Sequence, residues 1–252
     1  MTEKNILEIE HLSLTAVDAA GREQQILKDI SIEISENKIT CLVGESGSGK
    51  SMTIAAVLGI LPKTVLLDQS SLIQFAGKRI FSVFQDPMNT FNPSVKVGRQ
   101  LYAMARAHGK TDRQAFDRDL REVLKDLNFT EPERVLEQYP FELSGGMLQR
   151  LMLGCGIALK PELMICDEPT TALDVTVQKE ILKILRAINR RFQTAILLVT
   201  HDFGVVAETA DAVIVMEKGR VVEQGEVFEI FDHPREAYTK ALMAAAFKGG
   251  IS

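Results

Sequence analysis

The fold of this chain is decided by one octapeptide, Gly44-Glu45-Ser46-Gly47-Ser48-Gly49-Lys50-Ser51. It fits the pattern G-x-x-x-x-G-K-[ST], in which glycines let successive backbone N–H groups turn toward a bound phosphate. The helix that begins at the end of this loop adds the positive end of its dipole. Lys50 places an ammonium on the β- and γ-phosphates, and the Ser51 hydroxyl can coordinate Mg²⁺. The octapeptide therefore predicts a nucleoside triphosphate site.

The segments on either side of the octapeptide fit this interpretation. Residues 39–43 are apolar enough for a buried strand, and residues 52–58 have the composition of a packed helix. A plain Gly/Ser turn between a strand and a helix would have the same flanks. The use made of the triphosphate must therefore be inferred from other motifs of the chain.

Composition limits the classes of protein that this chain can belong to. It has 252 residues, of which 46% are hydrophobic and 25% charged, as in ordinary globular proteins. A net charge of −5 and a pI near 5.5 argue against non-specific nucleic-acid binding, which needs a basic surface. No apolar run approaches the roughly 18 residues of a membrane span. The three cysteines lack paired spacing, so we expect core thiols in a reducing compartment.

The order of predicted elements indicates an α/β fold. Residues 6–35 alternate apolar and polar side chains, which predicts antiparallel strands with one wet face. Apolar strands then alternate with helices, which favours a mostly parallel sheet covered on both faces. Residues 88–160 are helical and interrupt this alternation. We therefore predict a single domain over residues 1–252, with a core formed by 1–87 and 161–252 and an inserted helical lobe over 88–160.

Two acidic residues follow a buried strand over residues 163–166. A carboxylate at the carboxyl end of a strand, on the same sheet as the octapeptide, is suited to hold Mg²⁺, and Asp167 is the candidate. Glu168 is one residue further on, where it can polarise an attacking water as general base. A solvated acidic pair is the alternative, and the octapeptide in the same chain favours the catalytic interpretation.

A second anion site is predicted at Leu143-Ser144-Gly145-Gly146-Met147. Ser144 is a natural N-cap for the long helix that follows. Two glycines weaken a helix start unless something must approach it closely, which distinguishes this stretch from an ordinary capped helix.

Taken together, these motifs resemble the nucleotide-binding subunit of ATP-binding-cassette (ABC) transporters. The resemblance covers nearly the whole chain and rests on an ordered set: GESGSGKS, Gln85, LSGGM, LMICDEP, residues 172–174 and His201. It implies a P-loop NTPase fold with a RecA-like, mostly parallel sheet, an N-terminal antiparallel β-subdomain and an inserted helical lobe. It also implies a head-to-tail dimer that holds ATP between the P-loop of one subunit and Ser144, Gly145 and Gly146 of the other.

The resemblance assigns further roles. Gln85 would contact Mg²⁺ and the attacking water, His201 would hold the γ-phosphate, and Asp174 would lie at the dimer seam. With Lys50, Asp167 and Glu168 also intact, the resemblance implies an active ATPase that uses ATP and Mg²⁺.

Several stretches are similar to the peptide and nickel importer subgroup, among them Gln85–Met88 and residues 167–178. GGMLQR and the segment 58–62 favour nickel or metal-chelate importers over oligopeptide importers. This subgroup implies a second, non-identical ATPase subunit, two membrane-spanning permease subunits, a solute-binding protein and a peripheral place on the cytoplasmic face of the cell membrane.

An ATP-gated clamp on DNA or ribosomes is the alternative function, although the helical insertion is short for that class of protein. A metabolite kinase would not need the LSGG motif.

The chain departs from the family pattern at two places. The aromatic residue that usually stacks on adenine would lie near Ala16, and no aromatic side chain is nearby in the sequence. We therefore expect a nucleotide held chiefly by its phosphates. Residues 63–80 are also short for the hairpin and helix that usually precede Gln85.

Overall fold

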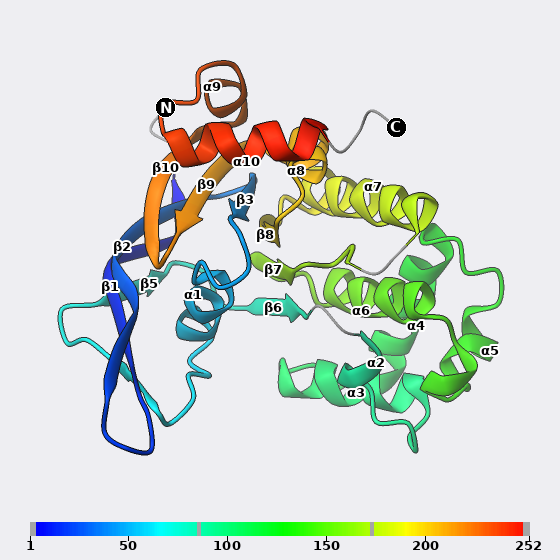
Figure 1. Ribbon diagram of the computed structural model, residues 1–252. Helices are drawn as coiled ribbons and strands as arrows, with labels where there is room; N and C mark the ends of the chain where they lie inside the picture. The colour runs from blue at the N-terminus through cyan, green and yellow to red at the C-terminus, as the bar shows by residue number, and fades with distance from the viewer. Residues whose placement is uncertain (1–3, 85–86, 172–173, 249–252) are drawn as a thin grey trace.

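The computed structural model describes residues 4–84, 87–171 and 174–248 (Figure 1). Within them, a six-stranded sheet has the order β10-β9-β3-β8-β7-β6, in which all neighbours are parallel except β9 and β10. The strands of this sheet are β3 Ile39–Val43, β6 Ile80–Val83, β7 Leu163–Asp167, β8 Ala195–Thr200, β9 Ala212–Glu217 and β10 Arg220–Glu226. The predicted α/β class and mostly parallel sheet are confirmed.

The central sheet is buried on both faces because apolar side chains occupy both sides of its strands. In β3, Cys41 and Val43 pack into a cluster with the helices α6, α7 and α8, whereas Leu42 packs into a second cluster with α1 and the N-terminal strands. Burial raises the pKa of Cys41 to about 12. The sulfur atoms of all three cysteines are free and buried, as expected for core thiols.

The N-terminal strands form a separate antiparallel sheet. β1 (Asn5–Val17) pairs with β2 (Glu23–Ser35), β4 (Val65–Leu67) and β5 (Leu72–Phe75). Gly21, with a φ of 76°, lies in the turn between β1 and β2. β4 and β5 come from residues that showed no clear pattern in the sequence. They are short and mostly exposed, and their strand conformation comes from pairing with β1.

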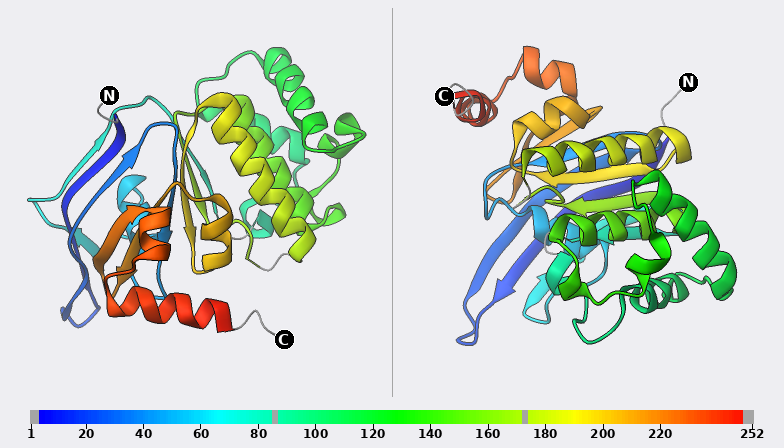
Figure 2. Two further views of the ribbon diagram at one scale, coloured as in Figure 1. Left: turned by 90° about the horizontal axis from the view of Figure 1, so that it is seen from above. Right: turned by 90° about the vertical axis from the view of Figure 1, so that its right-hand side faces the viewer.

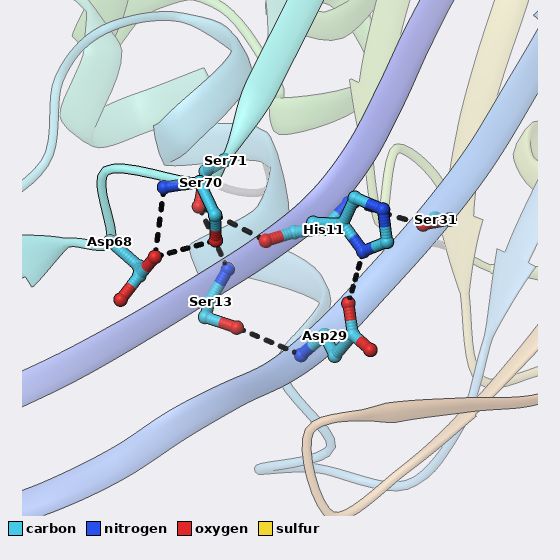
Figure 3. A network of polar contacts seen from close by, with 7 residues as sticks. All are labelled: His11, Ser13, Asp29, Ser31, Asp68, Ser70 and Ser71. Carbon is cyan, nitrogen blue, oxygen red and sulfur yellow. Dashed lines mark hydrogen bonds and ion pairs between the residues drawn. The ribbon is translucent and has the colours of Figure 1, made fainter.

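A polar network ties β1 and β2 to the segment before β5 (Figure 3). His11 and Asp29 both have positive φ, 55° and 57°, where the strand register shifts, and His11 Nδ1 lies 2.8 Å from Asp29 Oδ1. Ser71 Oγ donates to the His11 carbonyl and accepts from the Ser13 N–H, both at 3.1 Å. The irregular backbone of two strands is therefore satisfied by side chains rather than by ladder hydrogen bonds.

Helices fill the remaining space around the central sheet. Figure 1 shows α2 to α6 gathered on one side of the molecule, opposite β1 and β2, while α7 and α10 lie along the upper face of the view. Figure 2, seen from above, shows α7 running alongside the strands of the central sheet. The helices are α1 Lys50–Val57, α2 Pro87–Thr90, α3 Val97–Ala107, α4 Arg113–Asp126, α5 Pro132–Leu136, the 3₁₀ turn η1 Pro140–Glu142, α6 Gly145–Leu159, α7 Val175–Phe192, α8 Phe203–Thr209, α9 Val227–Asp232 and α10 Ala237–Lys248.

The parallel register brings three strand ends to one edge of the sheet. Val43 at the end of β3 pairs with Thr200 at the end of β8, and Asp167 at the end of β7 pairs with Val199. The residues that follow these strands therefore share one edge, which is where ligands bind in open α/β sheets.

Candidate nucleotide site

The phosphate-binding loop connects β3 to α1 and depends on glycines with positive φ. Gly47 has a φ of 80°, and a Cβ there would meet nothing within 4 Å, so the backbone is open to a ligand. Gly49 has a φ of 111°, and a Cβ there would lie 2.5 Å from Leu27 Cδ2. A Cβ at Gly44 would overlap the carbonyl oxygen of Met216. One side of the loop is therefore packed against the protein, and the other is free to approach a phosphate.

The turn between β9 and β10 supports this loop from behind. The Gly219 N–H donates to the Ser48 carbonyl at 2.9 Å, and the Gly219 carbonyl accepts from the Lys28 N–H at 2.8 Å. Gly219 has a φ of 81°, and a Cβ there would overlap the carbonyl oxygen of Ile26. The hairpin thus links the phosphate-binding loop to β2.

Lys50 is the first residue of α1, and its side chain turns back into the loop. Lys50 Nζ donates to the carbonyl oxygens of Gly44, at 2.7 Å, and Glu45, at 2.9 Å. Burial lowers the pKa of Lys50, and the charges of Glu168 and Asp167 oppose this effect. The ammonium therefore lies between the loop and two carboxylates, where a phosphate would find it.

Ser51 and Asp167 bring two oxygen donors together. Ser51 Oγ donates to Asp167 Oδ2 at 3.4 Å, across the gap between α1 and the end of β7. Burial raises the pKa of Asp167, as does the neighbouring Glu168 charge, while Ser51 and Lys50 lower it. A hydroxyl and a carboxylate are oxygen ligands of the kind that Mg²⁺ prefers, so the donor set fits this ion.

Glu168 is held in one orientation by two partners. Glu168 Oε1 lies 3.1 Å from His201 Nδ1, and Oε2 accepts from the Thr171 hydroxyl at 2.9 Å. Its backbone has a φ of 46°, which is uncommon for a residue with a side chain and is typical of functional sites. The structure therefore places Glu168, the predicted general base, next to His201, which was predicted to hold the γ-phosphate.

One pocket of about 770 Å³ contains these groups. Its lining includes Lys50, Ser51, Glu168 and His201, and its volume is within the range of about 300–1,000 Å³ that is typical of ligand pockets. The loop residues Gly44, Glu45, Ser46, Gly47 and Gly49 complete its polar part, and Ile26, Met52, Leu242, Ala245 and Ala246 form its apolar part. The last three belong to α10, whose contribution the sequence did not reveal.

The predicted second anion site lies elsewhere. Ser144 caps α6 by accepting from the Met147 N–H at 3.3 Å, and a Cβ at Gly145 would meet nothing within 4 Å. A Cβ at Gly146 would lie 2.9 Å from Val177 Cγ1, so packing against α7 is sufficient to explain this glycine. None of the predicted residues Ser144, Gly145 and Gly146 lines the pocket of the phosphate-binding loop.

The remaining predicted residues have mixed outcomes. Gln85 lies outside the described residues. Asp174 caps α7, where its carboxylate accepts from the Thr176 and Val177 N–H groups at 3.0 Å.

Gln149 of α6 was not predicted, yet it is buried and both polar atoms of its side-chain amide lack hydrogen-bond partners among the described residues. Only the tertiary structure reveals this, because a glutamine in a helix carries no such signal in the sequence.

Comparison with protein families identifies the chain. The family model described as ABC transporter matches residues 27–171, which include the phosphate-binding loop, the capped start of α6 and the acidic end of β7. The chain belongs to the ABC transporter family. An ABC ATPase binds ATP and hydrolyses it.

Relatives of this ABC ATPase cover almost its whole length. The oligopeptide transport ATP-binding protein OppD of Lactococcus lactis subsp. cremoris (strain SK11) is 37% identical, over 96% of this chain and 76% of the relative. The metal-staphylopine import system ATP-binding protein CntD of Staphylococcus aureus (strain NCTC 8325 / PS 47) is 35% identical, over 96% of this chain and 94% of the relative. The solved structure of cbiO1 from Clostridium perfringens, part of an ABC transporter complex, is 28% identical with a TM-score of 0.75 over 92% of both chains.

Proposed function

We propose that this ABC ATPase energises the uptake of a small solute, a peptide or a metal chelate, across the cytoplasmic membrane. One observation carries the ATPase part of the proposal: a single pocket holds Lys50 and Ser51 together with Glu168 and His201. The printed names of the relatives, an oligopeptide transport protein and a metal-staphylopine import protein, support the class of solute.

The proposed mechanism follows from the geometry of the pocket. The N–H groups of residues 44–51 and the Lys50 ammonium bind the phosphates and stabilise charge on the transferring group. Glu168 accepts a proton from the attacking water, and His201 keeps the Glu168 carboxylate in place from 3.1 Å away. We assign Mg²⁺ to Ser51, Asp167 and Gln85; when bound, it neutralises charge on the phosphate oxygens.

Completion of the site requires a second subunit in this proposal. Ser144, Gly145 and Gly146 form the start of α6, where a Cβ at Gly145 would meet nothing within 4 Å, but none of the three lines the pocket of its own chain. We therefore assign them to the ATP of a partner ATPase, with Asp174 at the seam. Residues 88–160 would act as a lobe that, together with Gln85, contacts two permease subunits.

Substitutions of Ser144 separate its structural role from this proposed role. Ser144→Ala removes the cap of α6 and should lower the free energy of unfolding by about 1 kcal/mol. Ser144→Asp keeps the cap but adds a negative charge that would face the partner's ATP, so the assembled complex should lose at least about tenfold in ATP turnover. Thermal unfolding and turnover are measured for both variants. Wild-type turnover in Ser144→Asp would contradict the shared site.

The complex is expected at the membrane. Among residues 4–84, 87–171 and 174–248, no helix is long and apolar enough to span a bilayer. We propose that the chain reaches the cytoplasmic face through its permease partners, with a solute-binding protein completing the system and a second, non-identical ATPase beside it. We assign the pocket to ATP and not to the imported solute, so the preference for nickel or another metal chelate rests on sequence similarity alone.

Isolation of the complex tests the function. The chain should co-purify with membranes, and ATP hydrolysis by the complex should rise when a peptide or a metal chelate is supplied with its binding protein. Co-purification with DNA or ribosomes would instead support the ATP-gated clamp. ATP turnover that neither solute class changes would overturn the proposed solutes.

A further inference from the structure

The C-terminal helix α10 is attached to the phosphate-binding loop. The Tyr238 hydroxyl accepts from the Glu45 N–H at 3.1 Å, which joins the first turn of α10 to the second residue of the loop. Tyr238, Leu242 and Ala245 follow one another at spacings of four and three, so they share one face of the helix. Leu242 and Ala245 line the nucleotide pocket. This face of α10 is therefore directed toward the nucleotide site.

The start of α10 is fixed by a buried carboxylate of β10. Glu223 accepts from the Arg235 N–H at 2.7 Å and from the Glu236 N–H at 3.2 Å, just before the first residue of α10. Burial raises the pKa of Glu223, but the polar groups around it, these two N–H groups among them, outweigh that effect and lower it. The ionised carboxylate stabilises the start of α10. The position of this helix over the loop is therefore fixed by its attachment to the buried end of Glu223 on β10.

Ile26 of β2 also lines the pocket. Leu14 pairs with Leu27 and Thr15 pairs with Gln25, so Ile26 is an extra residue in β2 at a register shift. Such a bulge turns a side chain away from its regular direction. The close approach of Gly219 to the Ile26 carbonyl holds the bulge next to the phosphate-binding loop.

The lining of the pocket therefore has a polar part and an apolar part. Lys50, Ser51, Glu168 and His201 mark the place of the phosphates. Apart from Met52, which follows Ser51, the apolar lining comes from Ile26 and from Leu242, Ala245 and Ala246 of α10. Ala16, where the family's stacking residue was expected, does not line the pocket. The flat faces of a base need apolar contact, and these apolar lining residues supply it.

We propose that α10 is the base-side wall of the nucleotide pocket, with Leu242 and Ile26 packing on the base in place of an aromatic ring. This inference rests on the assignment of the pocket to ATP. With α10 in place the pocket still has about 770 Å³, within the range of about 300–1,000 Å³ for ligand sites. The helix therefore forms a wall that leaves the site open.

The full-length chain is titrated calorimetrically with ATP and with inorganic tripolyphosphate, which has no base, under the same Mg²⁺ concentration. Leu242→Ala should weaken ATP binding about tenfold, as expected for an apolar contact removed from a pocket, and leave tripolyphosphate binding within about twofold of wild type. Leu242→Met conserves volume and should restore ATP affinity. Met243→Ala is the matched control, since Met243 packs against the core and does not line the pocket; both affinities should stay unchanged.

Three results would overturn the inference: unchanged ATP affinity in Leu242→Ala, tighter ATP binding, or an equal loss for ATP and tripolyphosphate. Tighter binding would mean that α10 obstructs the site, and an equal loss would mean that it acts on the phosphate end. Lys50→Ala tests the underlying assignment, because it should weaken both ligands by at least about tenfold. Unchanged binding in Lys50→Ala would reject the pocket itself, whatever Leu242 does.

Discussion

Glu168→Gln should reduce steady-state ATP turnover by at least about 10²-fold, the usual contribution of a general base. The amide keeps the shape of the side chain but cannot accept a proton from water. ATP affinity should stay near wild type, because the phosphates are bound by the loop and by Lys50, which already donates within the loop at 2.7 and 2.9 Å. Release of phosphate and calorimetric titration with ATP measure the two effects separately. ATP should also favour a closed dimer of this variant on gel filtration.

Glu180→Gln is the matched control. Glu180 lies on α7, 3.8 Å from Arg150 on α6, and its side chain is 44% exposed. The same chemical change there should leave turnover within about twofold, because exposed ion pairs contribute little. If Glu168→Gln hydrolysed ATP at the wild-type rate, another group would have to be the base.

Gly219→Ala should have the second large effect. The φ of 81° disfavours a side chain, and the new Cβ would overlap the carbonyl oxygen of Ile26. Relief of this overlap must move either β2 or the turn that donates to the Ser48 carbonyl at 2.9 Å. We expect a loss of at least about 3 kcal/mol in the free energy of unfolding, together with weaker ATP binding. Thermal unfolding and calorimetric titration measure these two quantities.

Gly21→Ala separates the backbone effect from the overlap. Gly21 has a φ of 76°, almost that of Gly219, but a Cβ there would meet nothing within 4 Å. Gly21→Ala should therefore lower the free energy of unfolding by only about 1–2 kcal/mol, or the melting temperature by roughly 2–8 °C, and leave ATP binding unchanged. Equal losses in both variants would show that the contact with Ile26 has no energetic consequence.

The elements with strong local patterns could be predicted from the sequence. The strands β3, β7 and β8 are mostly apolar because both faces of the central sheet are covered, and the backbone conformation of the phosphate-binding loop requires its glycines. Ser144 caps α6 as predicted, because its residue type favours that position. Asp174 caps α7 for the same reason, although it was predicted only at the dimer seam.

Features that depend on long-range contacts could not be predicted. β4 has three residues and β5 has four, and both become strands only by pairing with β1. Gly146 was expected to admit a ligand, and the structure provides another reason, the nearby Val177 side chain. The place of α10 over the loop depends on Glu223 and Tyr238, whose partners are far away in the sequence.

The support of the phosphate-binding loop also has a consequence for biosynthesis. The loop is made early, at residues 44–51, whereas the turn behind it, at Gly219, and the hydroxyl that contacts Glu45, at Tyr238, come near the end of the chain. Proteins are synthesised from the N-terminus at about 5–20 residues per second. For roughly 8–34 seconds, therefore, a nascent chain carries the loop without its support, and nucleotide binding should begin only after the residues around Gly219 and Tyr238 have left the ribosome.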